Sequence, residues 1–142
     1  MRNNHFRDKV VYQIYPKSFC DTNGDGIGDL NGVTEKLDYL KELGVDYIWL
    51  TPFFVSPQND NGYDVADYKK VEPMFGTMDD FDRLVKEADQ RGIGIMLDMV
   101  FNHTSTSHEW FQKALAGDPE YMDYYIFKDS PEQVPPTNWI SK

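Results

Sequence analysis

Apolar residues gather in three short continuous runs along the chain. The runs are Val10–Tyr15, Tyr47–Leu50 and Ile93–Val100, and they are rich in β-branched and aromatic residues. Such runs are typical of buried strands. The third is interrupted only by Gly94 and Asp98, which predicts a parallel strand covered on both faces.

Between these runs the apolar residues recur every three or four positions, which predicts amphipathic helices. The first helix is expected to end at Gly44, and the second to begin at a Thr77 cap and to end at Gly92. Their expected buried faces comprise Leu30, Val33, Leu37, Leu40 and Leu43 in the first, and Phe81, Leu84, Val85 and Ala88 in the second.

Three strands alternating with two helices predict an α/β fold with the order βαβαβ, a parallel sheet and right-handed crossovers. A long loop is expected from Phe53 to Gly76. After residue 103 the pattern changes, with a short helix expected over His108–Ala116, an aromatic segment over Tyr121–Phe127 and a loop over Ser130–Pro136. Because three parallel strands leave open edges, we expect either further strands that close a barrel or a longer protein of which this chain is a piece.

Composition narrows the functional classes. The 142 residues carry a formal charge of −10, which argues against a nucleic-acid partner because phosphate backbones are held by clustered Lys and Arg. No apolar run approaches the roughly 18 residues of a membrane span. With one cysteine, Cys20, and no apolar leader at the N-terminus, we expect a cytoplasmic protein without an internal disulfide.

An acidic, glycine-rich loop follows the first strand. Its oxygen-bearing side chains and one backbone carbonyl are spaced as ligands of a hard cation, which favours a Ca²⁺ site; they belong to Asp21, Asn23, Asp25, Ile27 and Asp29. An EF-hand is excluded because the twelfth loop position is Gly32 rather than Glu. The alternative is a loop of Asx turns in which Asp29 caps the next helix.

Two further groups of polar residues follow the second and third strands. Asn61-Gly62-Tyr63-Asp64 could bind a sugar through the ring and the carboxylate, or could be a tight turn with a solvent-facing Asp. Asp98 lies within an apolar run and needs a polar partner, while Asn102 and His103 follow directly. On a barrel all of these would lie on the catalytic face, although His103 could equally be a structural hydrogen-bonding residue.

These segments together resemble the α-amylase-type enzymes of glycoside hydrolase family 13. The resemblance is carried by VVYQIYPKSFCDTNGDGIGDLNGVTEKLDYLKELGVDYIWLTPFF, NDNGYDVADY, FGTMDDF and DMVFNHTSTSHEWF. They are most similar to the branch of oligo-1,6-glucosidases and trehalose-6-phosphate hydrolases. The resemblance implies the first three βα units of a (β/α)₈ TIM barrel in residues 1–103, and the start of a small inserted domain in residues 104–142, including NWISK.

The resemblance also implies roles for single residues. Tyr63 would be the platform under a glucose ring, Asp64 the acid that holds its hydroxyls and His103 a donor to its 6-hydroxyl. Asp98 would orient an arginine beside the nucleophile, and Asn102 would shape that loop. The acidic loop would be the Ca²⁺ site of this branch.

The implied activity is retaining hydrolysis of a small α-glucoside by two carboxylates. We expect the N-terminal part of an α-glucosidase that hydrolyses trehalose 6-phosphate to glucose and glucose 6-phosphate, with an oligo-1,6-glucosidase acting on isomalto-oligosaccharides as the alternative. The catalytic carboxylates would lie downstream, so the chain alone is expected to be inactive. A lesser alternative is a catalytically inactive amylase-like module. The sequence gives no indication of oligomeric state.

Overall fold

The structure, a computed structural model, describes residues 6–129. Five strands lie in two sheets, joined by α-helices and short 3₁₀ helices. In chain order the elements are η1 (Phe6–Asp8), β1 (Val11–Ile14), α1 (Pro16–Phe19), α2 (Leu30–Glu35), α3 (Leu37–Glu42), β2 (Tyr47–Leu50), β3 (Phe54–Val55), β4 (Asp67–Val71), η2 (Pro73–Phe75), α4 (Met78–Gln90), β5 (Gly94–Leu97), α5 (Glu109–Leu115) and α6 (Pro119–Met122).

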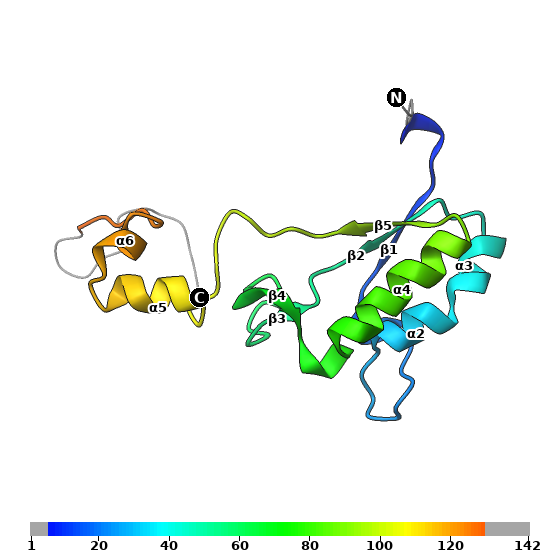
Figure 1. The fold of residues 1–142 in the computed structure, drawn as a ribbon, viewed down its shortest axis with the longest axis horizontal. Coiled ribbons are helices and arrows are strands. Elements are labelled where there is room, and N and C mark those ends of the chain that lie inside the picture. Colours follow the sequence, from blue (N-terminus) through cyan, green and yellow to red (C-terminus); the bar gives the residue numbers. More distant parts are fainter. Residues whose placement is uncertain (1–5, 130–142) are drawn as a thin grey trace.

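The main sheet is parallel and has the strand order β1-β2-β5, with Ile14 beside Leu50 and Leu50 beside Leu97. Helices α2, α3 and α4 lie together along the sheet (Figure 1). Ile14, Ile48 and Leu50 are almost completely buried, whereas the alternate residues Gln13 and Met96 are exposed. The predicted βαβαβ order and parallel sheet are therefore confirmed, with one covered face and one more open face.

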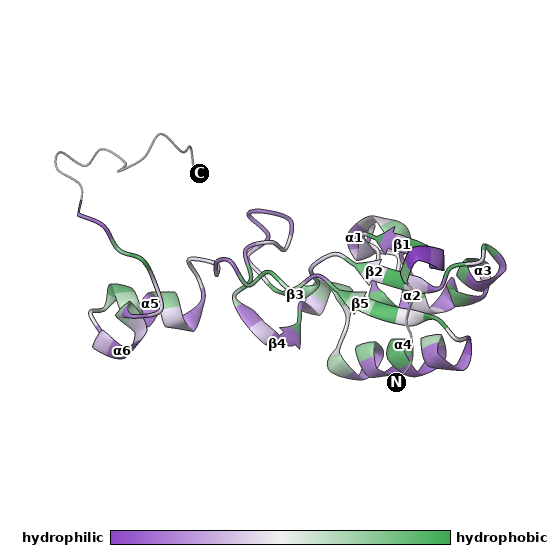
Figure 2. Cartoon of the chain, turned by 90° about the horizontal axis from the view of Figure 1, so that it is seen from above, coloured by the Kyte–Doolittle hydropathy of each residue, from purple (hydrophilic) through white to green (hydrophobic). Residues whose placement is uncertain are grey.

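Helix α4 follows the predicted pattern at both ends. Thr77 and Asp80 form a capping box, in which the Thr77 hydroxyl accepts from the Asp80 amide and the Asp80 carboxylate accepts from the Thr77 amide. The helix ends before Gly92, whose φ is 69°. Figure 2 shows hydrophobic residues concentrated in β2 and β5, with hydrophilic residues along the outer side of α4.

The first helix and two of the predicted core positions need correction. The stretch breaks into α2 and α3 at Lys36, two residues after Thr34. The Thr34 hydroxyl donates to the Leu30 carbonyl at 2.9 Å, a bond that often bends helices. Leu43 is exposed because α3 ends before it, and Val45 is buried instead. Val85 is exposed because it lies at the edge of the stripe formed by Leu84 and Ala88.

The third strand is shorter than predicted and is not covered on both faces. Its regular part is Gly94–Leu97, and Met96, Leu97 and Met99 are each more than a third exposed. The physical reason is that β5 is an edge of the sheet in the described residues. Asp98 consequently follows the strand rather than lying within it.

The predicted loop over residues 53–76 contains additional structure. Strands β3 and β4 pair antiparallel with an irregularity between Phe54 and Val55, and η2 follows them. This small sheet lies between the main sheet and the α5–α6 pair (Figure 1).

Helices α5 and α6 form a separate pair after an extended segment (Figure 1). Helix α5 matches the expected helix over His108–Ala116, with His108 as its N-cap and Ala116 as its C-cap. The division into residues 1–103 and 104–142 stays a prediction, and the loop expected over Ser130–Pro136 and the NWISK segment lie outside the described residues.

Candidate functional site

Two segments far apart in the sequence meet at the carboxyl end of the main sheet. The Tyr63 hydroxyl, from the loop after β2, donates to Asp98 Oδ2 at 3.0 Å. The ring of His103 reaches back to the same tyrosine, with Nε2 3.0 Å from the Tyr63 carbonyl oxygen. Tyr63 thus connects two of the residues that follow β5.

The contacts of His103 define which ring nitrogen carries the proton. A carbonyl oxygen only accepts hydrogen bonds, so Nε2 donates to Tyr63, while Nδ1 accepts from Asn102 Nδ2 at 3.2 Å. The ring is a donor through Nε2 in this arrangement. Asn102 therefore contacts the His103 ring, while its expected role in shaping the loop stays a prediction.

The environment of Tyr63 favours its neutral form. Burial raises the pKa of its hydroxyl to about 12, and the hydrogen bond to the Asp98 carboxylate acts in the same direction. The Tyr15 hydroxyl also contributes to the raised pKa, so it lies close by. Tyr15 follows β1, and sequence reasoning missed it because a tyrosine at a strand end looks like an ordinary core residue.

A tight turn presents Tyr63. Asn61 and Gly62 both have positive φ, 50° and 96°, as in the tight-turn alternative for this motif. A side chain at position 62 would also place its Cβ 2.7 Å from the Pro52 carbonyl oxygen. Glycine is therefore required there for two independent reasons.

The Asp64 carboxylate holds this turn and is not solvent-facing. Oδ1 accepts from the Ser56 hydroxyl at 2.8 Å and the Asp60 amide at 3.2 Å, and Oδ2 accepts from the Asn59 amide at 2.9 Å. Burial raises the pKa of Asp64, but these hydrogen bonds outweigh it and the net direction is downward. About four acceptor positions exist on a carboxylate, so one remains for a ligand.

A second carboxylate in the turn was not considered from the sequence. Asp60 is exposed, and within residues 6–129 its side chain makes no hydrogen bond or ion pair. Its full acceptor capacity is available, in contrast to that of Asp64. Asp60 directly precedes Asn61-Gly62 in the sequence. Spacing alone did not show whether Asp60 or Asp64 keeps its carboxylate free for a ligand.

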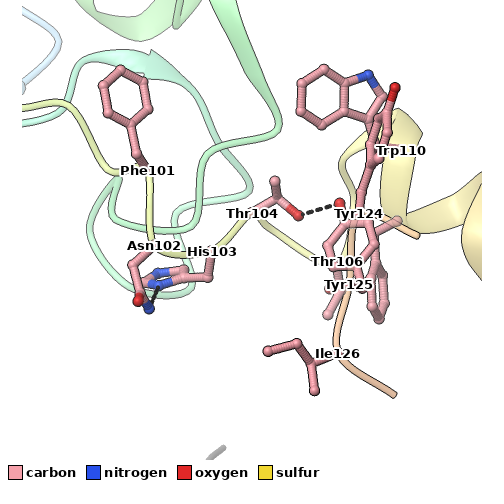
Figure 3. A pocket seen from close by; sticks show the side chains of 10 residues that line it. Phe101, Asn102, His103, Thr104, Thr106, Trp110, Tyr124, Tyr125 and Ile126 are labelled. Carbon is pink, nitrogen blue, oxygen red and sulfur yellow. Dashed lines mark hydrogen bonds between the residues drawn. The ribbon is translucent and has the colours of Figure 1, made fainter. Parts of the chain in front are cut away.

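A pocket of about 460 Å³ opens beside His103, between the segment after β5 and the α5–α6 pair. Asn102 and His103 line one side, and the aromatic residues Trp110, Tyr124 and Tyr125 line the other (Figure 3). The Thr104 and Tyr125 hydroxyls are hydrogen-bonded across it at 2.8 Å. Tyr63, Asp64 and Asp98 do not line this pocket.

The acidic loop after α1 is organised around its own backbone amides. The Asp21 carboxylate accepts hydrogen bonds from the backbone amides of Asn23, Gly24 and Gly26. These bonds lower the pKa of Asp21, and the bond from Gly26 has the largest effect. Asp29 caps α2 through Gly32 at 2.7 Å, as expected for the Asx-turn alternative. The described part of the chain contains no group of three or more His, Cys, Asp or Glu arranged to hold a metal ion. The loop does offer several hard oxygen donors, which is the chemistry that Ca²⁺ prefers.

The alpha-amylase catalytic-domain model matches residues 13–142. The chain belongs to this family. It is 61% identical to trehalose-6-phosphate hydrolase of Escherichia coli over 137 residues, and 57% identical to oligo-1,6-glucosidase of Heyndrickxia coagulans over 138 residues. Both alignments cover 96% of this chain and 25% of the relative. The chain thus spans about a quarter of the length of these enzymes.

A solved structure supports the same placement. The trehalose-6-phosphate hydrolase of Bacillus licheniformis superposes with a TM-score of 0.91 at 56% identity, covering 99% of this chain and 26% of that one. The expected fold class is confirmed: the three parallel strands and their helices are βα units of the family's barrel, which is incomplete in this chain. The more open face of the sheet corresponds to that incompleteness. No helix within the described residues has the length and apolar character needed to cross a membrane.

Proposed function

We propose that this chain forms part of the glucose-binding pocket of a retaining α-glucosidase that hydrolyses trehalose 6-phosphate. The observation that carries the proposal is the junction of Tyr63, Asp98 and His103 at the carboxyl end of the sheet, where barrel enzymes place their active sites. The 61% identity to the Escherichia coli trehalose-6-phosphate hydrolase supports this substrate.

Each residue of the junction has a chemical role in this proposal. The Tyr63 ring is fixed by its hydroxyl and can stack on the C–H face of a glucose. The Nε2 proton of His103, which the Tyr63 carbonyl accepts in the structure, would be donated in a hydrogen bond to a sugar hydroxyl when glucose binds. Asp98 supports the pocket through Tyr63. Asp60 and the remaining acceptor position of Asp64 can receive hydrogen bonds from sugar hydroxyls. Asn102 holds His103 in place.

The family's hydrolytic carboxylates are assigned to none of these residues. The chemistry is the displacement of the leaving sugar by a carboxylate, followed by hydrolysis of the glucosyl intermediate. The chain's own contribution is to bind and orient the glucose that is transferred. Accordingly, we expect the 142-residue chain by itself to release no glucose.

A hybrid enzyme tests the proposal, with this chain replacing the matching quarter of the Escherichia coli enzyme. We expect the hybrid to release glucose from trehalose 6-phosphate faster than from isomaltose at equal concentration. Because the remainder of the hybrid also affects the choice of substrate, a second hybrid should be built on the Heyndrickxia coagulans oligo-1,6-glucosidase. A folded hybrid that is inactive on both substrates in both contexts would refute the proposal and favour a catalytically inactive module.

The second candidate is an oligo-1,6-glucosidase, favoured by the 57% identity to that enzyme. Within residues 6–129 the only adjacent pair of basic residues is Lys69-Lys70. Of the adjacent pair Lys69-Lys70, Lys70 pairs with Asp67 at 3.0 Å and Lys69 is exposed. Preference for isomaltose in both hybrids would select this candidate.

The proposed protein also binds Ca²⁺ through the acidic loop. Asp21, Asn23, Asp25, Asp29 and the Ile27 carbonyl would hold a structural Ca²⁺, which would offset the repulsion between the loop's carboxylates. The cytoplasmic location stays a prediction from the sequence. The partner is a small carbohydrate.

A further inference from the structure

The segment that carries Asn102 and His103 has little regular structure of its own. Between β5 and α5, its backbone bonds include Phe101 N to Met99 O at 3.0 Å and Ser105 N to Val65 O at 2.8 Å. Asn102 and His103 are both exposed. The position of His103 therefore depends on contacts from other parts of the chain.

One side chain contacts this segment on both sides of Asn102. The Tyr68 hydroxyl lies 2.5 Å from the Val100 carbonyl oxygen and 2.9 Å from the His103 carbonyl oxygen. Both oxygens accept, so the single hydroxyl proton is shared between them. The bond joins positions 100 and 103 through one atom and closes the segment into a short loop.

Tyr68 is itself well placed to act as a fixed anchor. It belongs to β4, which pairs with β3. Its ring centroid lies 6.2 Å from that of Phe54, 6.2 Å from that of Phe101 and 5.8 Å from that of His108. The ring packing holds the side chain independently of the hydroxyl bonds.

We propose that Tyr68 is a positioning residue for His103, an inference that rests on the proposed function. The Tyr68 hydroxyl fixes the His103 main chain, while the Tyr63 carbonyl holds its ring through Nε2 at 3.0 Å until a sugar hydroxyl replaces that carbonyl. The two tethers come from neighbouring residues, Tyr63 in the turn and Tyr68 in β4. Together they aim the imidazole at a defined point, so the loss of the Tyr68 tether displaces the donor without removing it.

Tyr68→Phe in the Escherichia coli hybrid tests this inference. The substitution retains the ring and deletes only the hydroxyl. We expect kcat/KM for trehalose 6-phosphate to fall about 10-fold to 100-fold, because a displacement on the order of 1 Å at a reacting site costs about 100-fold. Tyr12→Phe is the control: Tyr12 is also half-buried, and no hydrogen bond of its hydroxyl occurs in the described part of the chain. We expect Tyr12→Phe to leave activity unchanged.

A double-mutant cycle separates positioning from general structural support. In a His103→Ala background, Tyr68→Phe should cause little further loss, because the residue through which it acts is absent. The loss from Tyr68→Phe should also divide between kcat and KM in the same proportion as the loss from His103→Ala.

Three results would overturn the inference. An unchanged kcat/KM in Tyr68→Phe would show that the hydroxyl has no role in activity. An equal loss with and without the His103 side chain, or a Tyr68→Phe hybrid that fails to fold, would show a role other than positioning His103. An inactive unsubstituted hybrid would instead overturn the proposed function and this inference with it. The two failures are therefore distinguishable.

Discussion

The hydrogen bond between Tyr63 and Asp98 gives a quantitative prediction for Tyr63→Phe. The substitution keeps the stacking ring but removes the 3.0 Å bond to the carboxylate. Hydrogen bonds to charged groups contribute about 1.5–3 kcal/mol. Because Tyr63 and Asp98 are both half-buried, the lower end applies, and about 1.4 kcal/mol corresponds to about tenfold in rate.

The raised pKa of Tyr63 agrees with a neutral hydroxyl that donates to Asp98. The pKa rises from 10.0 to about 12, which means that the phenolate is disfavoured at this position. Burial is the larger cause of the rise, so the hydrogen bond accounts for only part of it. The expected effect therefore rests on the hydrogen bond itself, at about 1.5 kcal/mol.

The assay is kcat/KM of the hybrid enzyme for trehalose 6-phosphate. We expect about a tenfold loss in Tyr63→Phe and no loss in Tyr12→Phe. Because the folded-state pKa of Tyr63 is raised, the stability that this group contributes is complete below pH 10 and is lost as the pH rises towards 12. An ultraviolet titration of phenolate should show that Tyr63→Phe removes a group that ionises near pH 12. Unchanged kcat/KM, or loss of a group that ionises near pH 10, would refute the reasoning.

Three further predictions concern the turn, the acidic loop and a helix cap. Asp64→Asn should lower the melting temperature because the turn loses a carboxylate acceptor. Since folding lowers the pKa of Asp64, the stability that Asp64 contributes is present near neutral pH and is lost as the pH falls below the ordinary pKa of an aspartate. Asp60→Asn, in contrast, should raise KM and leave the melting temperature unchanged. Addition of Ca²⁺ after EDTA treatment should raise the melting temperature of the hybrid, and Asp21→Asn should reduce that rise; an equal rise in the variant would contradict the proposed site. Thr77→Ala should cost about 1 kcal/mol of stability, measured by denaturant unfolding, because the capping box is lost.

The strands and helices were predictable where the signal is local. The apolar run Tyr47–Leu50 coincides with β2, and Thr77 with Asp80 specified the start of α4. The break at Lys36 was missed because apolar periodicity does not report local side-chain bonds such as that from Thr34 to the Leu30 carbonyl. The pairing of β3 with β4 was missed because it joins residues well separated in sequence across an irregular register.

The site was predictable as single residues and not as an arrangement. Tyr63, Asp98 and His103 were selected by their places after strands, but their mutual contacts depend on the fold bringing positions 35 to 40 residues apart together. Nothing in the sequence marked Tyr68, since a tyrosine in a strand is also what a core requires. Which of the two carboxylates, Asp60 or Asp64, is occupied by hydrogen bonds within the turn likewise depends on where the Ser56 hydroxyl lies.

The measurement that tests the central claim most directly is the crystal structure of the hybrid enzyme with glucose bound. The account predicts the glucose ring stacked on Tyr63, with His103 Nε2 within hydrogen-bonding distance of a sugar hydroxyl and a carboxylate of the 59–64 turn on another. Glucose bound elsewhere in a folded and active hybrid, without contact to Tyr63 or His103, would contradict it.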